Sequence, residues 1–279
     1  MLPKLVTTLA ICSLSSLTHA SIIYTDALVT FGGVTPNYDS STLTSSLLTG
    51  VNSTQLANTG LGGINNSGVF VETFDVATQL GTALAASPFG PGTQAFNSSI
   101  GDNSGCAVNG TGSGITTSGS FSVREDDAPG LALIGYDDNC FGYTPEDGSS
   151  SGTVNIDFNP ILVQAGALTG TEVAMDYIGF YWATIDTYNT FTFRNNGIDV
   201  LEITGGDLSN AITNLQLGST SQYVNVFFNQ GIFFDELEVV STRRAAEFDN
   251  IVNRIVPVPE PTSIGLIGIV LISLLRIRK

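Results

Sequence analysis

The sequence predicts an all-β protein, an antiparallel β-sandwich or jelly-roll-like fold that forms a single domain. Three observations predict it. Short runs of β-branched and aromatic residues alternate with polar ones, turn-forming residues separate these runs, and no helical apolar period is sustained over about 15 residues. The chain has 279 residues, of which 42% are hydrophobic and only 12% are charged, so it contains enough apolar material for a core.

Five segments in the second half of the chain carry the strand pattern. They are Val154–Phe158, Tyr188–Phe193, Ile198–Ile203, Tyr223–Phe228 and Ile232–Val240.

Turn residues and helix signals divide these segments. Asn196-Gly197 is typical of a tight hairpin turn in which both residues have positive φ. We expect a short helix from Asp207 to Asn214 with Asp207 as its N-cap. The Ser-, Thr-, Asn- and Gly-rich stretch Ser40–Gly68 predicts a loop, with a helical turn at Ser45–Leu48.

The first 20 residues are typical of a secretory signal peptide. Lys4 supplies the positive charge, Leu5–Leu17 form the apolar region, and Thr18-His19-Ala20 offers small residues at the cleavage site. We therefore expect signal peptidase to cut between Ala20 and Ser21. The alternative is a buried N-terminal helix. Cys12 follows Ile11 rather than a small residue, which argues against a lipid anchor.

The C-terminal end combines three parts in a fixed order. Val258-Pro259-Glu260-Pro261 precedes an apolar run over residues 264–275, and the basic residues Arg276, Arg278 and Lys279 follow. The prolines keep the junction extended, as a protease site requires. Traced back to the prolines, the apolar run would span about 22 Å as a helix, less than the ~30 Å of a bilayer core. It is suited to transient membrane engagement, with the basic end in the cytoplasm.

This C-terminal end resembles the PEP-CTERM sorting signal, over about Val258 to Lys279. The resemblance implies a Gram-negative host, export across the inner membrane, and processing by an exosortase, a membrane protease-transpeptidase. It also implies delivery to the cell surface or the exopolysaccharide matrix. The alternative is an ordinary C-terminal membrane anchor. The predicted organisation is therefore a signal peptide (1–20), a β-sandwich (21–256) and a sorting region (257–279).

A second resemblance, to exosortase-dependent surface proteins, covers about Val173–Ile251. Asp176–Trp182, Ile185–Thr190 and Glu247–Ile251 carry it. It implies a β-sandwich at the cell surface and brings no established activity. The end strand Phe248-Asp-Asn-Ile251 is also similar to jelly-roll carbohydrate-binding modules.

The charge balance excludes nucleic-acid binding. Residues 21–259 contain 24 acidic residues against five arginines and no lysine, so their formal net charge is −19. Such a surface repels phosphate backbones. A solvated acidic surface is the simplest interpretation, and attraction of Ca²⁺ is the functional one.

Catalytic chemistry is restricted by what this part of the chain lacks. Its sequence contains no histidine, because His19 lies in the predicted signal peptide. Ser-His-Asp and Cys-His catalysis and His-bearing zinc sites are therefore excluded. No glycine-rich phosphate loop is present. A carboxylate-based hydrolase remains possible in principle, but 24 acids make a suitably spaced pair unavoidable, so such a pair is no evidence. We expect no enzymatic activity.

Two cysteines and several acids remain as candidates for structural sites. Cys106 and Cys140 would meet an oxidising compartment and are expected to pair, with a contribution of about 3–4 kcal/mol; the alternative is a reactive thiol. Loop carboxylates are hard oxygen ligands suited to a structural Ca²⁺, against the alternative of solvated loops. The candidate ligands are Asp126, Asp127, Asp137, Asp138 and Asp249.

Two functions follow as hypotheses. The first is a structural or adhesive protein of the cell surface or exopolysaccharide matrix. The alternative is a carbohydrate-binding module with a structural Ca²⁺, in which Trp182, Tyr177, Phe180 and Tyr181 could stack on sugar rings. Strand alternation places half of these aromatic residues in the core and favours Trp182 there.

Overall fold

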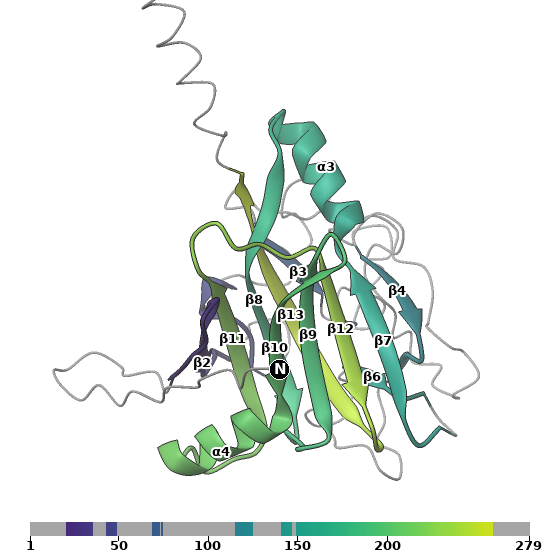
Figure 1. Ribbon diagram of the computed structural model, residues 1–279, viewed down its shortest axis with the longest axis vertical. Helices are drawn as coiled ribbons and strands as arrows, with labels where there is room; N and C mark the ends of the chain where they lie inside the picture. The colour runs from purple at the N-terminus through teal and green to yellow at the C-terminus, as the bar shows by residue number, and fades with distance from the viewer. Residues whose placement is uncertain are drawn as a thin grey trace, which may run out of the picture.

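The computed structural model confirms the predicted all-β fold, an antiparallel sandwich of two sheets (Figure 1). The structure describes residues 21–35, 43–48, 69–72, 74, 115–124, 141–146 and 149–258. The predicted signal peptide, the cysteines and the sorting motif from Pro259 onward lie outside these residues. Within them, no helix is long and apolar enough to cross a membrane.

The first sheet has eight strands and is built around two long central ones. Strand β8 pairs with β11 on one side and with β13 on the other. β3 pairs with the second half of β13, while β6 pairs with its first half. In spatial order the strands are β1 (Ser21–Ile23), β2 (Ala27–Phe31), β11 (Gln222–Phe228), β8 (Val173–Ala183), β13 (Ala246–Pro257), β6 (Phe141–Thr144) and β5 (Ser122–Arg124), with β3 (Val69–Glu72) beside β13.

The second sheet has five strands, in the order β10 (Ile198–Thr204), β9 (Asn189–Asn195), β12 (Glu236–Ser241), β7 (Gly152–Asp157) and β4 (Thr116–Gly119). The predicted hairpin joins β9 to β10. Asn196 and Gly197 form a two-residue turn with φ of 50° and 73°, as its type requires. Of the five predicted strands, four agree closely. The fifth begins only at Glu236, because residues 232–235 contain no regular structure beyond an isolated bridge at Phe234 and a bend.

Aromatic rings fill the space between the sheets. Phe191 of β9 stacks on Phe180 of β8 with 4.9 Å between ring centroids, and lies 4.1 Å from the ring of Trp182. Phe248 of β13 meets the same Phe191 edge-on at 6.1 Å. All four side chains are buried, so this cluster joins the two sheets at the centre of the core.

The predicted second-half helix is present, with different ends. Helix α4 runs from Gly205 to Leu215, and its N-cap is Thr204, whose hydroxyl accepts a hydrogen bond from the Asp207 N–H. The prediction of Asp207 as N-cap was therefore wrong, because the threonine three residues earlier has the extended backbone that a cap needs. The expected helical turn is confirmed as a 3-10 helix, η1 (Ser46–Leu48).

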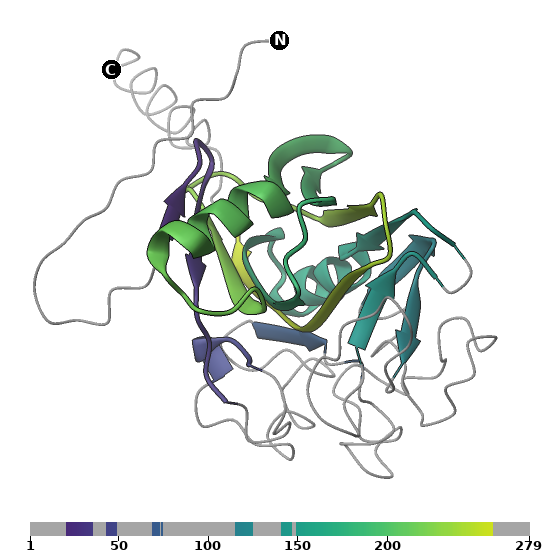
Figure 2. The ribbon, with the colours of Figure 1, turned by 90° about the horizontal axis from the view of Figure 1, so that it is seen from below.

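A second helix, α3 (Asn159–Thr169), was not expected from the sequence. Its residues are apolar or neutral around the whole circumference, so no polar face marks a helical period. Pro160 in its first turn and the left-handed Gly170 at its end are the two local signals that mark its bounds. In Figure 1, α3 and α4 lie at opposite ends of the sandwich, and Figure 2 views it from the α4 end.

A buried polar network fastens the 43–48 segment to the first sheet. The Tyr177 hydroxyl donates to Asn225 Oδ1 at 2.8 Å, and the Ser45 hydroxyl lies 2.7 Å from the same tyrosine oxygen. The Asn225 amide donates onward to the Gly32 carbonyl at 2.8 Å. Because Tyr177 alternates with the core residue Phe180, the network lies on the sheet face turned away from the second sheet.

Replacing Tyr177 with phenylalanine is expected to cost about 1–3 kcal/mol at neutral pH, because buried Asn225 and Ser45 each lose a partner. Burial raises the pKa of Tyr177 to about 12, from about 10 in an unfolded chain. Folding stability from this hydroxyl is full below pH 10 and falls as the pH rises toward 12. Phenylalanine has no hydroxyl to ionise, so Tyr177→Phe has no such loss. The difference in folding stability between the parent protein and the variant should therefore shrink between pH 10 and pH 12.

Urea unfolding of both proteins at pH 7 and at pH 11 measures this difference. Other buried tyrosines make the parent protein lose stability in alkali too, so the comparison is the gap between parent and variant at each pH. A gap that stays constant between the two pH values would contradict the role assigned to the Tyr177 hydroxyl.

Candidate functional site

The aromatic residues of β8 do not form a sugar-stacking surface. Trp182 and Phe180 face the sandwich interior, Tyr177 is buried in the polar network, and Tyr181 is half-buried. The placement of Trp182 in the core is thus confirmed. The large exposed hydrophobic side chains of the described residues are all aliphatic: Ile23, Leu28, Leu47, Val163 and Ile198. The four aromatic residues of β8 that were candidates for sugar stacking therefore do not form a platform.

Asp249 is the one candidate Ca²⁺ ligand that the structure describes. It lies opposite Tyr181 in β13, directly before a bulge in which Asn250 has a φ of 48°. Its side chain is fully buried, and its Oδ1 accepts a hydrogen bond from the Asn250 N–H at 2.6 Å. Aspartate suits this place because its short side chain can satisfy a backbone donor that the bulge removes from the ladder.

The calcium hypothesis stays a prediction. Within the described ranges, no three side chains of histidine, cysteine, aspartate or glutamate come together in a way that could hold a metal ion. The other candidate ligands, Asp126, Asp127, Asp137 and Asp138, lie outside those ranges, as do Cys106 and Cys140. Ser21 begins β1, while Ala20 before it lies outside.

Two of the arginines are held by carboxylates. Arg194 of β9 contacts Asp199, Glu236 and Glu238 at 2.7 to 3.0 Å on the outer face of the second sheet. These three carboxylates raise the pKa of its guanidinium further above its already high value. Arg254 of β13 makes two hydrogen bonds, of 2.7 and 2.9 Å, to Asp176 of β8. Each arginine thus links its own strand to a neighbouring strand of the same sheet.

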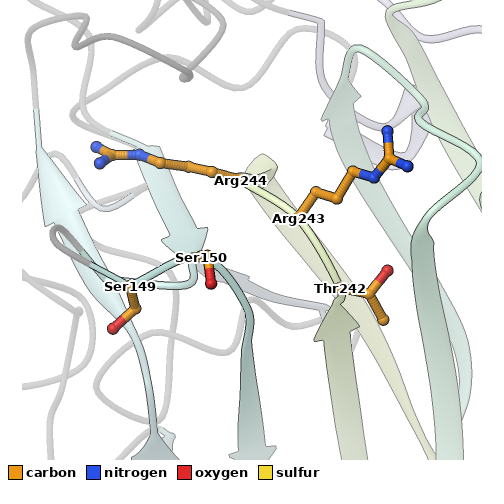
Figure 3. Close-up of a pocket in the computed structure, with 5 residues that line it drawn as sticks. All are labelled: Ser149, Ser150, Thr242, Arg243 and Arg244. Carbon is orange, nitrogen blue, oxygen red and sulfur yellow. The ribbon is translucent and has the colours of Figure 1, made fainter.

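Two other arginines border an open hollow at the start of β13. The hollow has a volume of about 450 Å³ and is lined by Ser149, Ser150, Thr242, Arg243 and Arg244. Figure 3 shows the two guanidinium groups pointing to opposite sides, with the three hydroxyl side chains below them. Because the guanidinium groups diverge, they do not chelate one small anion. Of the two, the exposed Arg243 is the one whose guanidinium faces the solvent at this edge.

Arg243 is the more accessible of the two. Its guanidinium carbon lies 5.8 Å from the centre of the Tyr188 ring, a cation–π contact, and its side chain is exposed. Tyr188 donates its hydroxyl to Asp186 at 2.7 Å. Burial, and then the hydrogen bond to this carboxylate, raise the pKa of Tyr188, so the phenol keeps its proton. The hollow thus offers guanidinium and hydroxyl groups and, among the residues that line it, no base or nucleophile pair.

The chain leaves the sandwich at its opposite end. β13 finishes at Pro257, and the next residue, Val258, donates its N–H to the Glu172 carbonyl at 2.9 Å. Val258 is the first residue of the predicted sorting motif and the last residue that the structure describes. The motif from Pro259 to Pro261 therefore follows the completed fold directly in sequence.

Comparisons with known proteins add no identification. A scan against models of protein families found no match, and a search of curated proteins found none either.

Proposed function

We propose that this chain is an exported, non-enzymatic surface protein with a structural or adhesive role in exopolysaccharide. Signal peptidase would release it at Ala20–Ser21, and an exosortase would process it at Val258-Pro259-Glu260-Pro261. The β-sandwich would remain at the cell surface or in the extracellular matrix of a Gram-negative bacterium, and residues 264–275 would hold it to the inner membrane until processing.

The observation that carries this proposal is the order of features at the end of the chain. The last strand of the sandwich ends at Pro257, and the three-part tail starts at the following residue. A processing enzyme could therefore act on the tail without unfolding a strand. The prolines at 259 and 261 disfavour regular structure there, as a protease substrate requires.

The non-enzymatic part of the proposal has support from composition. Residues 21–259 contain neither histidine nor lysine, the usual general bases and amine nucleophiles. A carboxylate-based hydrolase remains the enzymatic rival. Turnover of any chromogenic glycoside by the purified protein would favour that rival.

The decisive measurement is the intact mass of the protein recovered from the outside of its native host. We expect a chain that begins at Ser21 and ends near Pro259, with or without an added group. Glu260→Ala should retain residues 264–279. The matched variant is Glu172→Ala, at a residue outside the motif whose carbonyl accepts the hydrogen bond from Val258, and this variant should be processed normally. A parent protein that retains residues 264–279 would show that the tail is a plain membrane anchor.

The hollow at Arg243 favours a second candidate function, carbohydrate binding without an aromatic platform. Its guanidinium and hydroxyl groups can donate to sugar hydroxyls or uronate groups. Retention on polysaccharide columns should then be lost in Arg243→Ala and kept in Asn214→Ala, at an exposed site in α4. Loss of retention with EDTA would add a calcium requirement. A lack of retention on every glycan would remove this candidate.

A further inference from the structure

Helix α3 presents an uncharged surface to the solvent. Asn159–Thr169 contains no acidic or basic residue. Ile161 and Ala165 are buried against the sandwich, whereas Val163 is 71% exposed and Ala167 is exposed beside it. A surface helix of a soluble domain normally turns charged and polar side chains outward. The outer side of α3 therefore carries no charge, and between the exposed polar residues Asn159 and Thr169 near its two ends it turns Val163 and Ala167 to the solvent.

The same helix borders the point at which the chain leaves the sandwich. Val163 and Leu162 line a hollow of about 330 Å³ together with Val258, the last described residue. The Val258 N–H is bonded to the carbonyl of Glu172, three residues after the helix ends. Figure 1 shows α3 and the end of β13 at one end of the sandwich and α4 at the other.

The length of chain between this exit and the apolar run limits their separation. Only residues 259–263 lie between Val258 and Ile264. Fully extended, this stretch spans about 20 Å. The headgroup layer on each side of a bilayer takes up about 5–8 Å of that distance. The 11 residues of α3 make a helix about 16 Å long. The length of the helix is therefore similar to the distance left between Val258 and the headgroup layer when residues 259–263 are extended.

We propose that the outer side of α3 rests on the lipid surface of the inner membrane, on the side facing away from the cytoplasm, while the tail is inserted. This inference rests on the proposed function, since it requires residues 264–275 to engage the membrane. The contact orients the sandwich with α4 pointing away from the bilayer. It also keeps the processing motif at the membrane surface.

The chemistry of α3 defines the kind of contact. Without a basic residue on the helix, and with Glu172 exposed beside it, anionic lipids do not attract this end of the molecule. The contact between α3 and the lipid is then driven by the apolar burial of Val163 and its neighbours. This burial is too small to hold the protein at the membrane by itself. The tail supplies the attachment by raising the local concentration of lipid at α3. The contact should therefore depend on the tail and be insensitive to salt.

Quenching by brominated lipid tests the orientation. The full mature chain with its tail is reconstituted in vesicles of phosphatidylethanolamine, phosphatidylglycerol and brominated phosphatidylcholine. One variant carries Val163→Trp in α3, and its matched control carries Asn214→Trp at an exposed site in α4. The chain's own Trp182 is fully buried in the core and gives a common background. A third protein adds Ile267→Asp and Ile269→Asp to Val163→Trp, to disable the tail.

The expected result is strong quenching of Val163→Trp, at low and at high salt, with little quenching of Asn214→Trp or of the tail-disabled protein. Equal quenching at the two helices, or quenching at neither in protein that floats with the vesicles, would overturn the inference and leave the sorting proposal intact. A mature chain that fails to float with vesicles would overturn both. Concentration-dependent dimers that Val163→Glu abolishes in the tail-disabled protein would assign α3 to a second copy of this chain instead.

Discussion

Replacing Gly205 with alanine is expected to destabilise the sandwich by about 3 kcal/mol, an overpacking cost that falls on backbone atoms. Gly205 is buried at the first position of α4. A Cβ atom there would lie 2.7 Å from the carbonyl carbon of Asp186 and closer still to its oxygen. Since these are backbone atoms of the loop between β8 and β9, relief requires moving either that loop or the start of the helix.

The neighbouring glycine provides a matched control. At Gly206 the nearest atom to an added Cβ is the Thr204 hydroxyl, at 3.6 Å, which is ordinary van der Waals contact. Alanine at this position should be neutral, or stabilising by up to about 1 kcal/mol, because it restricts the unfolded chain and favours helix. The two variants differ by one residue in position and share the same chemistry.

Thermal and urea unfolding of the two variants measure the contrast. The expected pattern is a large loss of stability in Gly205→Ala and an unchanged or raised midpoint in Gly206→Ala. Similar stabilities for the two variants would mean that α4 does not pack against the β8–β9 loop as described. A loss of stability in Gly206→Ala alone would mean that Gly206, and not Gly205, lies on the buried face of α4.

Local patterns were enough to predict the fold class, four of the strands and one hairpin. Alternation of apolar and polar residues identified β7, β9, β10 and β11. In β11 the alternation marks two buried faces, because Asn225 belongs to the buried polar network. The Asn196-Gly197 turn was predictable because few dipeptides accept two positive φ angles. Helix α3 was missed for the opposite reason. It has no charged residue, and its few polar residues do not gather on one face, so no period is revealed. The Pro160 and Gly170 signals are too common to be decisive alone.

Some features of the candidate site could be predicted from local sequence patterns, and others could not. Strand alternation indicated that Trp182 belongs to the core, and the structure agrees. The grouping of Ser149, Ser150, Thr242 and Arg243 could not be predicted, because it depends on how two distant turns are brought together. The proposed sorting tail is a linear pattern of residues, so it can be predicted from the sequence without a fold.

Replacing Phe191 with alanine is expected to cost about 3–5 kcal/mol, because it opens a cavity where the two sheets meet. Phe191 is the ring of the second sheet that touches Phe180, Trp182 and Phe248 of the first sheet, at centroid distances of 4.9, 4.1 and 6.1 Å. All these neighbours are held by long central strands, so the cavity is expected to collapse only in part. Ile198→Ala is the matched control in the same sheet, since Ile198 is 70% exposed and should change stability by less than about 0.5 kcal/mol.

Trp182 reports on this prediction directly, because it is the single tryptophan of the chain and contacts Phe191. In the folded parent protein its emission should be short in wavelength and resistant to acrylamide. Urea titrations followed by this emission should show a much earlier transition for Phe191→Ala than for Ile198→Ala. Near-parental stability of Phe191→Ala, together with acrylamide access to Trp182 in the folded state, would contradict the buried cluster. It would return Trp182 to the role of a sugar-stacking residue. With the cluster intact, Phe180 and Trp182 of β8 hold the two sheets together and are not available to stack on a sugar ring.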